Sequence, residues 1–283
     1  MTHEEGFQRN ADSVASHRCE VIEHRWVNDR YKYLRLRAPS ALGSVTRAGQ
    51  FYQLRCPISD DMQPFLLRPM SVYGMGPAPD ELEFLYNVTG LGTRAVSVLP
   101  VGASMDIVGP LGNTFRLEES FKRILVVARG VGLATMAPLV QKAAAHQIAI
   151  TAVMSAREPK DLMRDEFLRG VAADVHCVYD SDGTSGVEAV EALIRKELAA
   201  RHHDAVYTCG SHRLLMLLQR ILADHPELIG QVAMEQRMAC GMGVCLSCVR
   251  LFDTAGGDKQ FLRVCREGPV FSIRDVVGEV EFG

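Results

Sequence analysis

The stretch "RMACGMGVCLSCVRL", residues 237–251, places three cysteines and two glycines within nine positions, and a fourth cysteine follows after a gap of sixteen. Structural zinc sites usually divide their ligands between two short C-x2–4-C pairs. Three cysteines in one loop with a distant fourth instead follow the plant-type [2Fe–2S] spacing. We therefore predict a [2Fe–2S] cluster, with a zinc site and unligated thiols as the alternatives. The predicted ligands are Cys240, Cys245, Cys248 and Cys265.

The glycines of this loop fit the same interpretation. A loop that carries three thiolates must wrap around one end of a cluster, and Gly241 and Gly243 permit the tight, left-handed turns that this requires. They also let backbone N–H groups approach the sulfur atoms, which offsets negative charge and tunes the reduction potential. The remaining cysteines stand in apolar or strand-like surroundings and are predicted to be ordinary buried thiols. They are Cys19, Cys56, Cys177 and Cys209.

Bulk composition describes a globular chain of more than one domain. The chain has 283 residues, 47% of them hydrophobic and 23% charged, and its net charge of −3 gives no reason to expect nucleic acid as a partner. No apolar stretch approaches the roughly 20 residues of a spanning helix, so no membrane span is expected. The N-terminus lacks the apolar segment of a signal peptide. We expect a cytoplasmic protein whose residues 1–17 form a flexible tail.

The first half of the chain is predicted to be a β domain. Short runs of β-branched and aromatic residues with period-two alternation are separated by Gly- and Pro-rich turns, which indicates an antiparallel barrel or sandwich over residues 18–118. A short helix is expected at 93–100. The runs are "CEVIEHRWV" (19–27), "YKYLRLRA" (31–38), "QFYQLRCP" (50–57), "MSVYGMG" (70–76), "LEFLYNV" (82–88) and "SMDIVGPLG" (104–112).

Apolar strands and helical segments then alternate, which predicts a doubly wound parallel α/β domain over residues 119–231. Residues 232–283 follow as a small domain that contains the cysteines and short β pieces, including "VRLF" and "FLRVC". The expected strands of the α/β domain are 123–128, 149–156, 174–180 and 204–210, and the expected helices are 133–147, 159–171, 186–201 and 212–224.

Two motifs in the β domain suit a flavin. In "LLRPMSVYG" (66–74), an Arg–Pro corner precedes a small hydroxyl: the arginine can bind a diphosphate, and the serine can reach the edge of the isoalloxazine ring. In "YNVTGLGTRAVSVL" (86–99), glycine amides open a short helix and could cradle a pyrophosphate. Each motif alone is common turn chemistry, and their combination is the signal. The predicted flavin-binding residues are Arg68, Pro69, Met70, Ser71, Tyr86, Gly90, Gly92 and Thr93.

The α/β domain offers a weaker signal for a nicotinamide dinucleotide. "RILVVARGVGLATMAPL" (123–139) is a strand, a glycine turn and a helix, although Thr135 replaces the last glycine of the G-x-G-x-x-G fingerprint. "YTCGSHRLLMLL" (207–218) ends a later strand in the same way, where a small cysteine could pack on a nicotinamide ring or be a core thiol. An arginine in "AREPKDL" (156–162) could reach the adenylate or be a solvated charge. The predicted residues are Gly130, Gly132, Arg157, Cys209 and Gly210.

At this point the residues resemble a family, the electron-transfer subunit of class 1B dihydroorotate dehydrogenase within the ferredoxin reductase superfamily. The most specific likeness is "EQRMACGMGVCLSCV" (235–249) with "RVCREGPVF" (263–271). The resemblance implies FAD on Arg-Pro-x-Ser and Gly-x-Gly-Thr, NAD(H), and a cluster on the four cysteines; NADP(H) is not excluded. One departure stands out, because Ala128 and Arg129 occupy positions where the family usually has Gly-Gly. They could hinder the dinucleotide, or Arg129 could contact a phosphate.

The resemblance further implies an electron-splitting oxidoreductase subunit with no acid–base catalytic residue. Two-electron hydride chemistry and one-electron cluster chemistry meet at a flavin, and the protein supplies distance, orientation and potential. The implied partner is an FMN-containing catalytic dehydrogenase subunit of pyrimidine biosynthesis, in a heterotetramer. The alternatives are a reductase for an oxygenase, which normally carries a whole ferredoxin domain, or the equivalent subunit of a hydrogenase, transhydrogenase or other dehydrogenase. A zinc-clipped interaction module is the non-enzymatic alternative.

Overall fold

The computed structural model describes residues 14–162, 165–172, 174–253 and 257–278. Contacts between residues divide the chain into two compact units. The barrel unit contains residues up to 114 together with 236–248 and 263–269, and the α/β unit contains 115–235, 249–262 and the segment from 270 onward. Residues 232–283 are therefore shared between the units, and the predicted boundaries at 118 and 231 stay predictions.

The barrel unit is built on an antiparallel six-stranded sheet in the order β4-β3-β6-β1-β2-β5. The sheet nearly closes on itself, because the Tyr73–Gly74 backbone after β4 hydrogen-bonds to Glu83 of β5. Two short helices, α1 (Leu42–Val45) and α2 (Leu91–Ser97), connect strands. The strands are β1 (Ala15–Trp26), β2 (Tyr31–Arg37), β3 (Phe51–Leu54), β4 (Arg68–Ser71), β5 (Glu81–Asn87) and β6 (Ser104–Leu111). The predicted β-barrel is confirmed.

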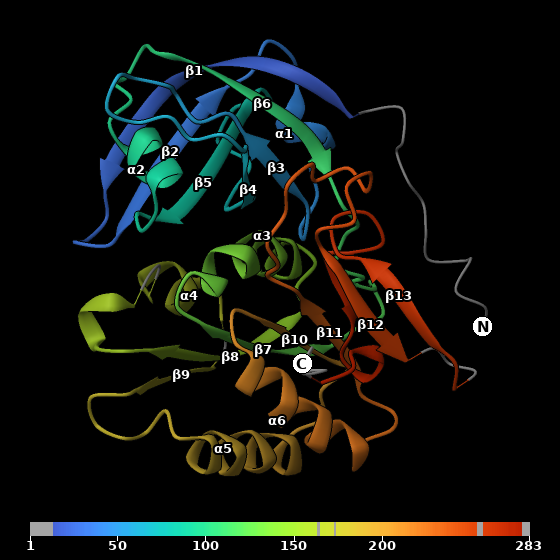
Figure 1. Ribbon diagram of the computed structural model, residues 1–283. Helices are drawn as coiled ribbons and strands as arrows, with labels where there is room; N and C mark the ends of the chain where they lie inside the picture. The colour runs from blue at the N-terminus through green and yellow to red at the C-terminus, as the bar shows by residue number, and fades with distance from the viewer. Residues whose placement is uncertain (1–13, 163–164, 173, 254–256, 279–283) are drawn as a thin grey trace. The chain divides into compact units, whose positions relative to one another are not determined.

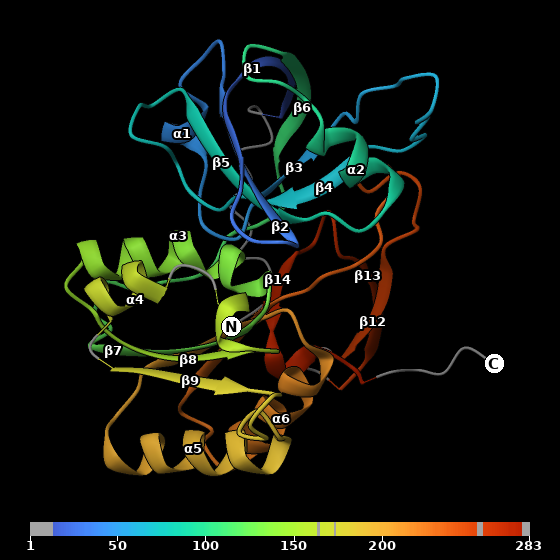
Figure 2. The same ribbon diagram turned by 90° about the vertical axis from the view of Figure 1, so that its left-hand side faces the viewer.

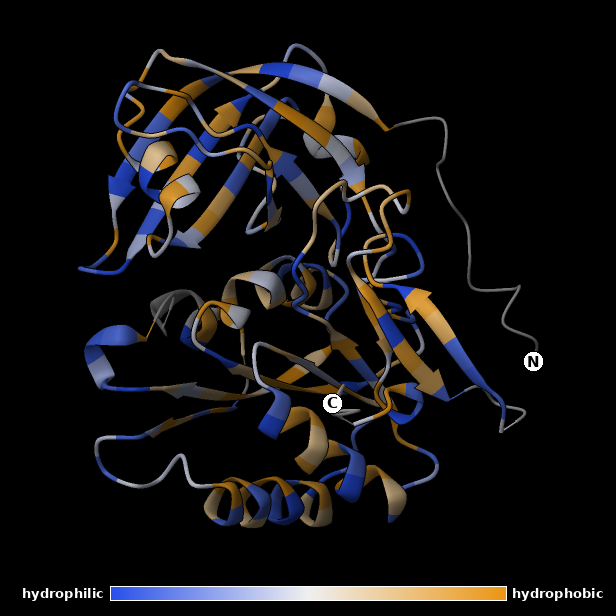
Figure 3. Ribbon diagram, viewed as in Figure 1, coloured by the Kyte–Doolittle hydropathy of each residue, from blue (hydrophilic) through white to orange (hydrophobic). Residues whose placement is uncertain are grey.

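Alternation along these strands builds the barrel core. Leu34 and Leu36 of β2, together with Tyr52 and Leu54 of β3, are fully buried in one apolar cluster, while intervening positions point away from it. Figure 3 shows this alternation as changes between orange and blue along the barrel strands. The strand β1 begins at Ala15, so Ala15–His17 pair with β6 instead of belonging to the predicted tail. The rest of that tail, residues 1–13, lies outside the described residues.

The α/β unit contains a six-stranded sheet in the order β14-β11-β10-β7-β8-β9, in which only β14 runs antiparallel to its neighbour. Helices α3 and α4 cover one face of this sheet, and α5 and α6 cover the other (Figures 1 and 2). The strands are β7 (Arg123–Arg129), β8 (Ala149–Ala156), β9 (Asp174–Tyr179), β10 (Ala205–Cys209), β11 (Ile229–Ala233) and β14 (Val270–Ser272). The helices are α3 (Gly132–Ala145), α4 (Asp165–Val171), α5 (Val187–Ala200) and α6 (His212–Ala223).

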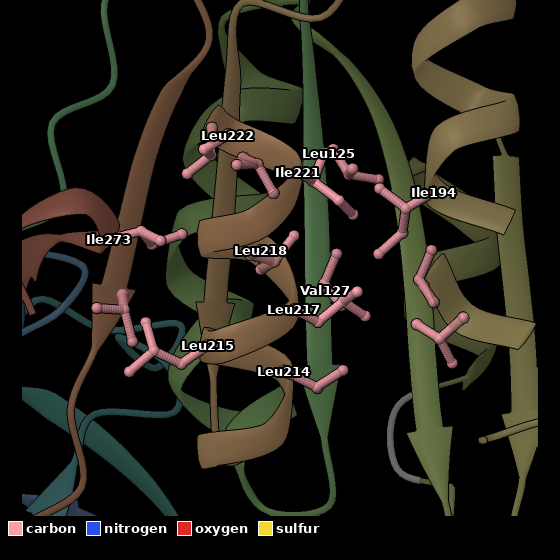
Figure 4. Close-up of a cluster of buried hydrophobic side chains, with 14 of the residues drawn as sticks. Leu125, Val127, Ile194, Leu214, Leu215, Leu217, Leu218, Ile221, Leu222 and Ile273 are labelled. Carbon is pink, nitrogen blue, oxygen red and sulfur yellow. The ribbon is translucent and has the colours of Figure 1, made fainter. Parts of the chain in front are cut away.

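The predicted doubly wound domain is therefore present, and its hydrophobic core explains why α6 forms. Leucines and isoleucines at helical spacing on α6 pack against Leu125 and Val127 of β7 and against Ile194 of α5 (Figure 4). The side chain of Ser211 accepts a hydrogen bond from the Leu214 N–H and caps the start of α6. This packing fixes the carboxyl ends of β7 and β10, where the nicotinamide residues were predicted.

Six short elements follow or interrupt the predicted pattern. The strands β12 (Val249–Asp253) and β13 (Lys259–Arg263) form a two-stranded sheet and match the predicted β pieces. The strands β11 and β14 were not predicted: β14 has only three residues, and β11, although as long as β10, has the sequence IGQVA, in which Gly and Gln interrupt the apolar run. Two single turns of 3-10 helix, at Pro159–Asp161 and Ile273–Asp275, complete the described chain.

Candidate functional site

The cysteine loop in the barrel unit is arranged to present backbone N–H groups to sulfur. The Cys240 Sγ atom accepts hydrogen bonds from the N–H groups of Met242, Val244 and Cys245 at 3.4, 3.4 and 3.5 Å. This geometry requires left-handed backbone at Gly241 and Gly243, whose φ values are +71° and +85°. The predicted role of both glycines is therefore confirmed. Three donors on one sulfur stabilise a thiolate and compensate the charge of a bound cluster.

The four cysteines form two pairs. Cys245 hydrogen-bonds to Cys240, and Cys265 hydrogen-bonds to Cys248, with the Cys265 N–H at 3.4 Å from the Cys248 Sγ atom. Among the described residues, no three His, Cys, Asp or Glu side chains converge on a point where one metal ion could bind. Cys240 also interacts electrostatically with Cys265, so the two pairs are near each other, as a two-iron cluster with two cysteines on each iron requires.

The two pairs lie in different environments. Cys245 is exposed, and its pKa is lowered to about 6, first by a hydrogen bond with Ser247 and then by the Cys240 backbone. Cys248 and Cys265 are buried, and burial is the main reason that the pKa of Cys265 is raised to about 12. One edge of the site therefore faces solvent, and the other lies inside the barrel unit. Ser247 was not predicted from sequence.

Ion pairing holds the second cysteine segment, residues 263–269, beside the loop. The Arg263 guanidinium donates to both oxygens of Glu267, at 3.0 and 2.5 Å, and its remaining nitrogen donates to the Gly243 carbonyl at 3.0 Å. A Cβ atom at Gly243 would lie 2.5 Å from the Arg266 side chain, so the two segments are in direct contact. The residues that bring Cys265 to the loop are thus identified by the structure and were not singled out by the sequence.

The two predicted flavin motifs come together in the barrel unit. A Cβ atom at Gly92 would lie 2.4 Å from the Arg68 guanidinium, so the arginine of β4 is in direct contact with the second residue of α2. Arg68 also donates to the Leu66 and Leu67 carbonyls, which orients its side chain. Met70 packs on the barrel core, while Pro69 and Ser71 are half-buried on β4. An arginine held at a glycine turn suits the diphosphate of a dinucleotide.

Two predicted flavin residues have structural partners. The Thr93 hydroxyl accepts hydrogen bonds from the Thr89 and Gly90 N–H groups, at 3.0 and 3.1 Å, so these amides are engaged by the chain itself. Tyr86 is buried in the barrel core, with its hydroxyl 2.8 Å from His24 Nε2. Their contact with a cofactor stays a prediction. Arg68 and Gly92 are the two residues that the structure brings into direct contact from the two motifs.

The predicted nicotinamide residues meet at the switch point of the α/β sheet, where β7 and β10 are neighbours although their connections run in opposite directions. A Cβ atom at Gly132 would lie 2.4 Å from the Cys209 carbonyl oxygen, and one at Gly210 would lie 2.6 Å from the Arg129 carbonyl oxygen. Both glycines allow two backbone turns to touch. Cys209 is buried and hydrogen-bonds to Thr135, and burial raises its pKa.

The unusual Arg129 is engaged by its own unit. Its guanidinium donates to Ser155 Oγ at 2.7 Å and to both carboxylate oxygens of Asp180, at 3.0 and 2.6 Å. These contacts cross the carboxyl ends of β7, β8 and β9, where dinucleotides bind in such sheets. Arg157, which follows β8, is exposed, and its predicted contact with the adenylate stays a prediction. Pairing with Asp180 could not be seen in the sequence.

Comparison with known proteins agrees with this geometry. The family described as the iron-sulfur cluster binding domain of dihydroorotate dehydrogenase B matches residues 235–277. A dihydroorotate dehydrogenase B (NAD(+)) electron transfer subunit from Desulforamulus reducens is 32% identical over 87% of this chain and 92% of its own length. Its counterpart from Bacillus velezensis is also 32% identical, over 82% of this chain and 88% of the relative.

Solved structures define the fold. An NADH-dependent reduced ferredoxin-NADP oxidoreductase superposes with a TM-score of 0.73 at 23% identity, covering 92% of this chain and 90% of its own. Phthalate dioxygenase reductase, described as transferring electrons from pyridine nucleotides to [2Fe-2S], superposes with a TM-score of 0.63 at 15% identity, covering 90% of this chain and 78% of its own. The fold class is that of the ferredoxin-reductase-like electron-transfer proteins. Within it, the chain belongs to the family of dihydroorotate dehydrogenase B electron transfer subunits.

Family membership confirms the predicted electron-transfer function. Together with the fold, it also confirms the predicted cofactor set of FAD, a [2Fe–2S] cluster and NAD(H). Among the described residues, no helix is long and apolar enough to cross a membrane. The fold and the chemistry of the donor groups both agree with this cofactor set.

Proposed function

We propose that the chain carries electrons between NAD(H) and a partner dehydrogenase, with Cys240 and Cys245 on one iron of a [2Fe–2S] cluster and Cys248 and Cys265 on the other. Two sets of hydrogen bonds carry this assignment. Three backbone N–H groups, one of them from Cys245, donate to Cys240 Sγ, and the Cys265 N–H donates to Cys248 Sγ. The exposed Cys245 side lets an electron leave toward a partner. The buried pair anchors the cluster to the barrel unit.

FAD is proposed to bind at Arg68 and Gly92, with the guanidinium on the diphosphate and Ser71 at the edge of the ring. When bound, FAD supplies the conversion between two-electron hydride transfer and one-electron transfer. The residues of the chain bind and orient: Arg68 is fixed by two carbonyls, and Gly92 leaves the space that a side chain would fill. No side chain is assigned as an acid or a base.

NAD(H) is proposed as the pyridine nucleotide in preference to NADP(H), at the switch point marked by Gly132 and Gly210. The relatives carry NAD(+) in their names. In addition, both terminal nitrogens of Arg129, the cation nearest the turn in sequence, already donate to Asp180 and Ser155 instead of awaiting an extra phosphate. Cys209 and Gly210 would pack on the nicotinamide, because both lie at the end of β10.

The proposed partner is an FMN-containing catalytic subunit of dihydroorotate dehydrogenase type, in a cytoplasmic heterotetramer. Apolar side chains around the cluster loop are exposed where a shielding role would bury them: Val244 is 80% exposed, Leu246 59% and Met242 46%. Three exposed apolar side chains within five residues of one loop are the kind of surface that interaction sites use. All eight cysteines are free, which fits a reducing compartment.

An anaerobic absorbance and EPR titration with NADH, repeated with NADPH, tests this function. The protein should show flavin bands and a reducible [2Fe–2S] signal, and Cys245→Ala should lose the signal while the control Cys177→Ala keeps it. A colourless protein that contains zinc would contradict the proposal. Association with a dihydroorotate-oxidising subunit and NAD⁺ reduction by dihydroorotate test the partner separately. Failure of those steps alone would leave the electron-transfer assignment standing.

A further inference from the structure

One polar side chain of the barrel unit is buried in a place that neither predicted site explains. Alternation along β3 turns Tyr52 and Leu54 into the barrel core, so Phe51 and Gln53 point to the outer face of the strand. Side chains on the outer face of a barrel strand are expected to be exposed to solvent. Yet Phe51 is only 3% exposed and Gln53 is completely buried. Something within the barrel unit covers the outer face of β3.

The cover is the cysteine loop. A Cβ atom at Gly241 would lie 2.4 Å from Gln53 Nε2 and 2.7 Å from its Cγ atom. The same nitrogen donates a hydrogen bond of 3.4 Å to the Ala239 carbonyl. Ala239 and Gly241 are the two neighbours of Cys240, so the Gln53 amide contacts the backbone on both sides of a proposed cluster ligand. Gly241 cannot be replaced without displacing Gln53.

The strand that pairs with β3 at Gln53 carries one of the flavin motifs. In the antiparallel pair of β3 and β4, Gln53 lies opposite Pro69 and Phe51 lies opposite Ser71. Directly opposite residues point to the same face of a sheet, so Gln53 shares its face with Pro69 and Ser71. One buried amide thus lies between a strand of the proposed FAD site and the loop of the proposed cluster.

The chemistry of Gln53 indicates more than packing. Its Oε1 atom has no hydrogen-bond partner among the residues that the structure describes. A buried, unpaired amide oxygen loses its hydration without compensation, whereas a leucine of similar size would fill the space without that cost. The amide nitrogen is engaged by the Ala239 carbonyl, and the amide oxygen leaves a dipole without a partner beside the cysteine loop.

We propose that Gln53 is a positioning residue for electron transfer, whose amide holds the backbone around Cys240 on the strand beside the flavin motif and sets the reduction potential of the cluster. The inference rests on the proposed function, because it requires the cluster to be bound by Cys240. Gln53 donates no electron and takes part in no bond change. It fixes the loop and adds a dipole beside it.

Gln53→Glu, Gln53→Leu and the matched control Gln50→Glu test this in the full FAD- and iron-loaded chain. Gln50 is also in the barrel unit, but its amide donates to the Gly112 carbonyl at 3.4 Å, and no described contact joins it to residues 236–248. Potentiometric titration in mildly alkaline buffer, EPR of the reduced cluster and stopped-flow reduction by NADH are the measurements. Iron content verifies that each variant is loaded.

For Gln53→Glu, we expect the ratio of reduced to oxidised cluster at a fixed solution potential to fall about tenfold or more, because a carboxylate beside the cluster opposes an added electron. Gln50→Glu should change that ratio less than about threefold. Gln53→Leu should keep its iron but show an altered EPR spectrum and slower electron transfer from flavin to cluster.

An unchanged potential and EPR spectrum in Gln53→Glu would overturn the inference, as would equal shifts in both glutamate variants. If Gln53→Glu does not take up iron, Gln53→Leu tests the inference. A wild-type potential, EPR spectrum and transfer rate in that variant would show that Gln53 only fills space. A wild-type protein without any [2Fe–2S] signal would instead contradict the proposed function, so the two failures are distinguishable.

Discussion

The Arg129 guanidinium and the Asp180 carboxylate form a bidentate ion pair, with N–O distances of 3.0 and 2.6 Å. The pair spans β8, since Arg129 ends β7 and Asp180 follows β9. It stands at the carboxyl edge of the sheet, where the proposed dinucleotide site lies. The arginine that departs from the usual Gly-Gly turn therefore acts first as the counter-ion of an acid at that edge.

Removing Arg129 is expected to weaken NAD⁺ binding through Asp180. In Arg129→Ala the carboxylate is left without its counter-ion near the dinucleotide phosphates, and the dissociation constant should rise about tenfold. In the double variant Arg129→Ala/Asp180→Asn it should return to within about threefold of the wild type. Isothermal titration with NAD⁺ measures both. A double variant as weak as the single one would show that Arg129 itself contacts the phosphates.

The same pair predicts a pH dependence of stability. The Arg129 hydrogen bonds, followed by that of Ser185, hold the pKa of Asp180 at about 2, below its ordinary value. A carboxyl with a lowered folded pKa contributes stability above its unfolded pKa of about 3.9 and loses that contribution as the pH falls toward 2. Because the Asp180 side chain is 42% exposed, solvent screening limits the contribution to about 1 kcal/mol. In urea unfolding, Asp180→Asn should have a free energy of unfolding lower than the wild type by this amount at pH near 7, and the difference should shrink below about pH 4. A difference that stays constant with pH would contradict the stabilising role of the ionised carboxylate.

Cluster removal should expose one cysteine to alkylation ahead of the others. Cys245 is exposed with a pKa lowered to about 6, so much of it is thiolate near neutral pH. Cys209 is buried, and burial raises its pKa. Mass spectrometry of the apo-protein after brief iodoacetamide treatment should find Cys245 labelled first and Cys209 unlabelled. Alkylated protein should no longer accept a cluster, and equal labelling of both thiols would contradict this environment.

Much of the fold could be predicted because its signals are local. Apolar runs identify β7, β8 and β10, of which β7 and β10 are followed directly by a glycine, and the strand β8 has the predicted bounds of 149–156. The cysteine spacing likewise predicts the loop, and the left-handed backbone at Gly241 and Gly243 follows from glycine itself. Sequence separation does not matter for these features.

Contacts between distant residues could not be predicted. Gln53 and Ala239 are 186 positions apart, and Arg129 and Asp180 are 51 apart, so no periodicity or spacing connects them. The strand β14 is three residues long and exists because β11 pairs with it. The Thr93 hydroxyl caps α2, a contact that was not predicted, because capping and ligand contact have the same sequence pattern; its role in binding a cofactor stays a prediction.

The contact of Arg68 with Gly92 gives a matched pair of variants for the flavin site. In Gly92→Ala the new Cβ atom would lie 2.4 Å from the Arg68 guanidinium and must displace it, whereas nothing lies within 4 Å of a Cβ atom at Gly90. Gly90 also has an ordinary φ of −110°, so Gly90→Ala is not strained. We expect Gly92→Ala to lower FAD affinity at least about tenfold, which corresponds to the loss of one charge-assisted contact, and Gly90→Ala to lower it less than about twofold. Fluorescence titration of the deflavinated protein with FAD measures both. Equal FAD affinity in the two variants would mean that Arg68 does not bind the diphosphate where β4 meets α2.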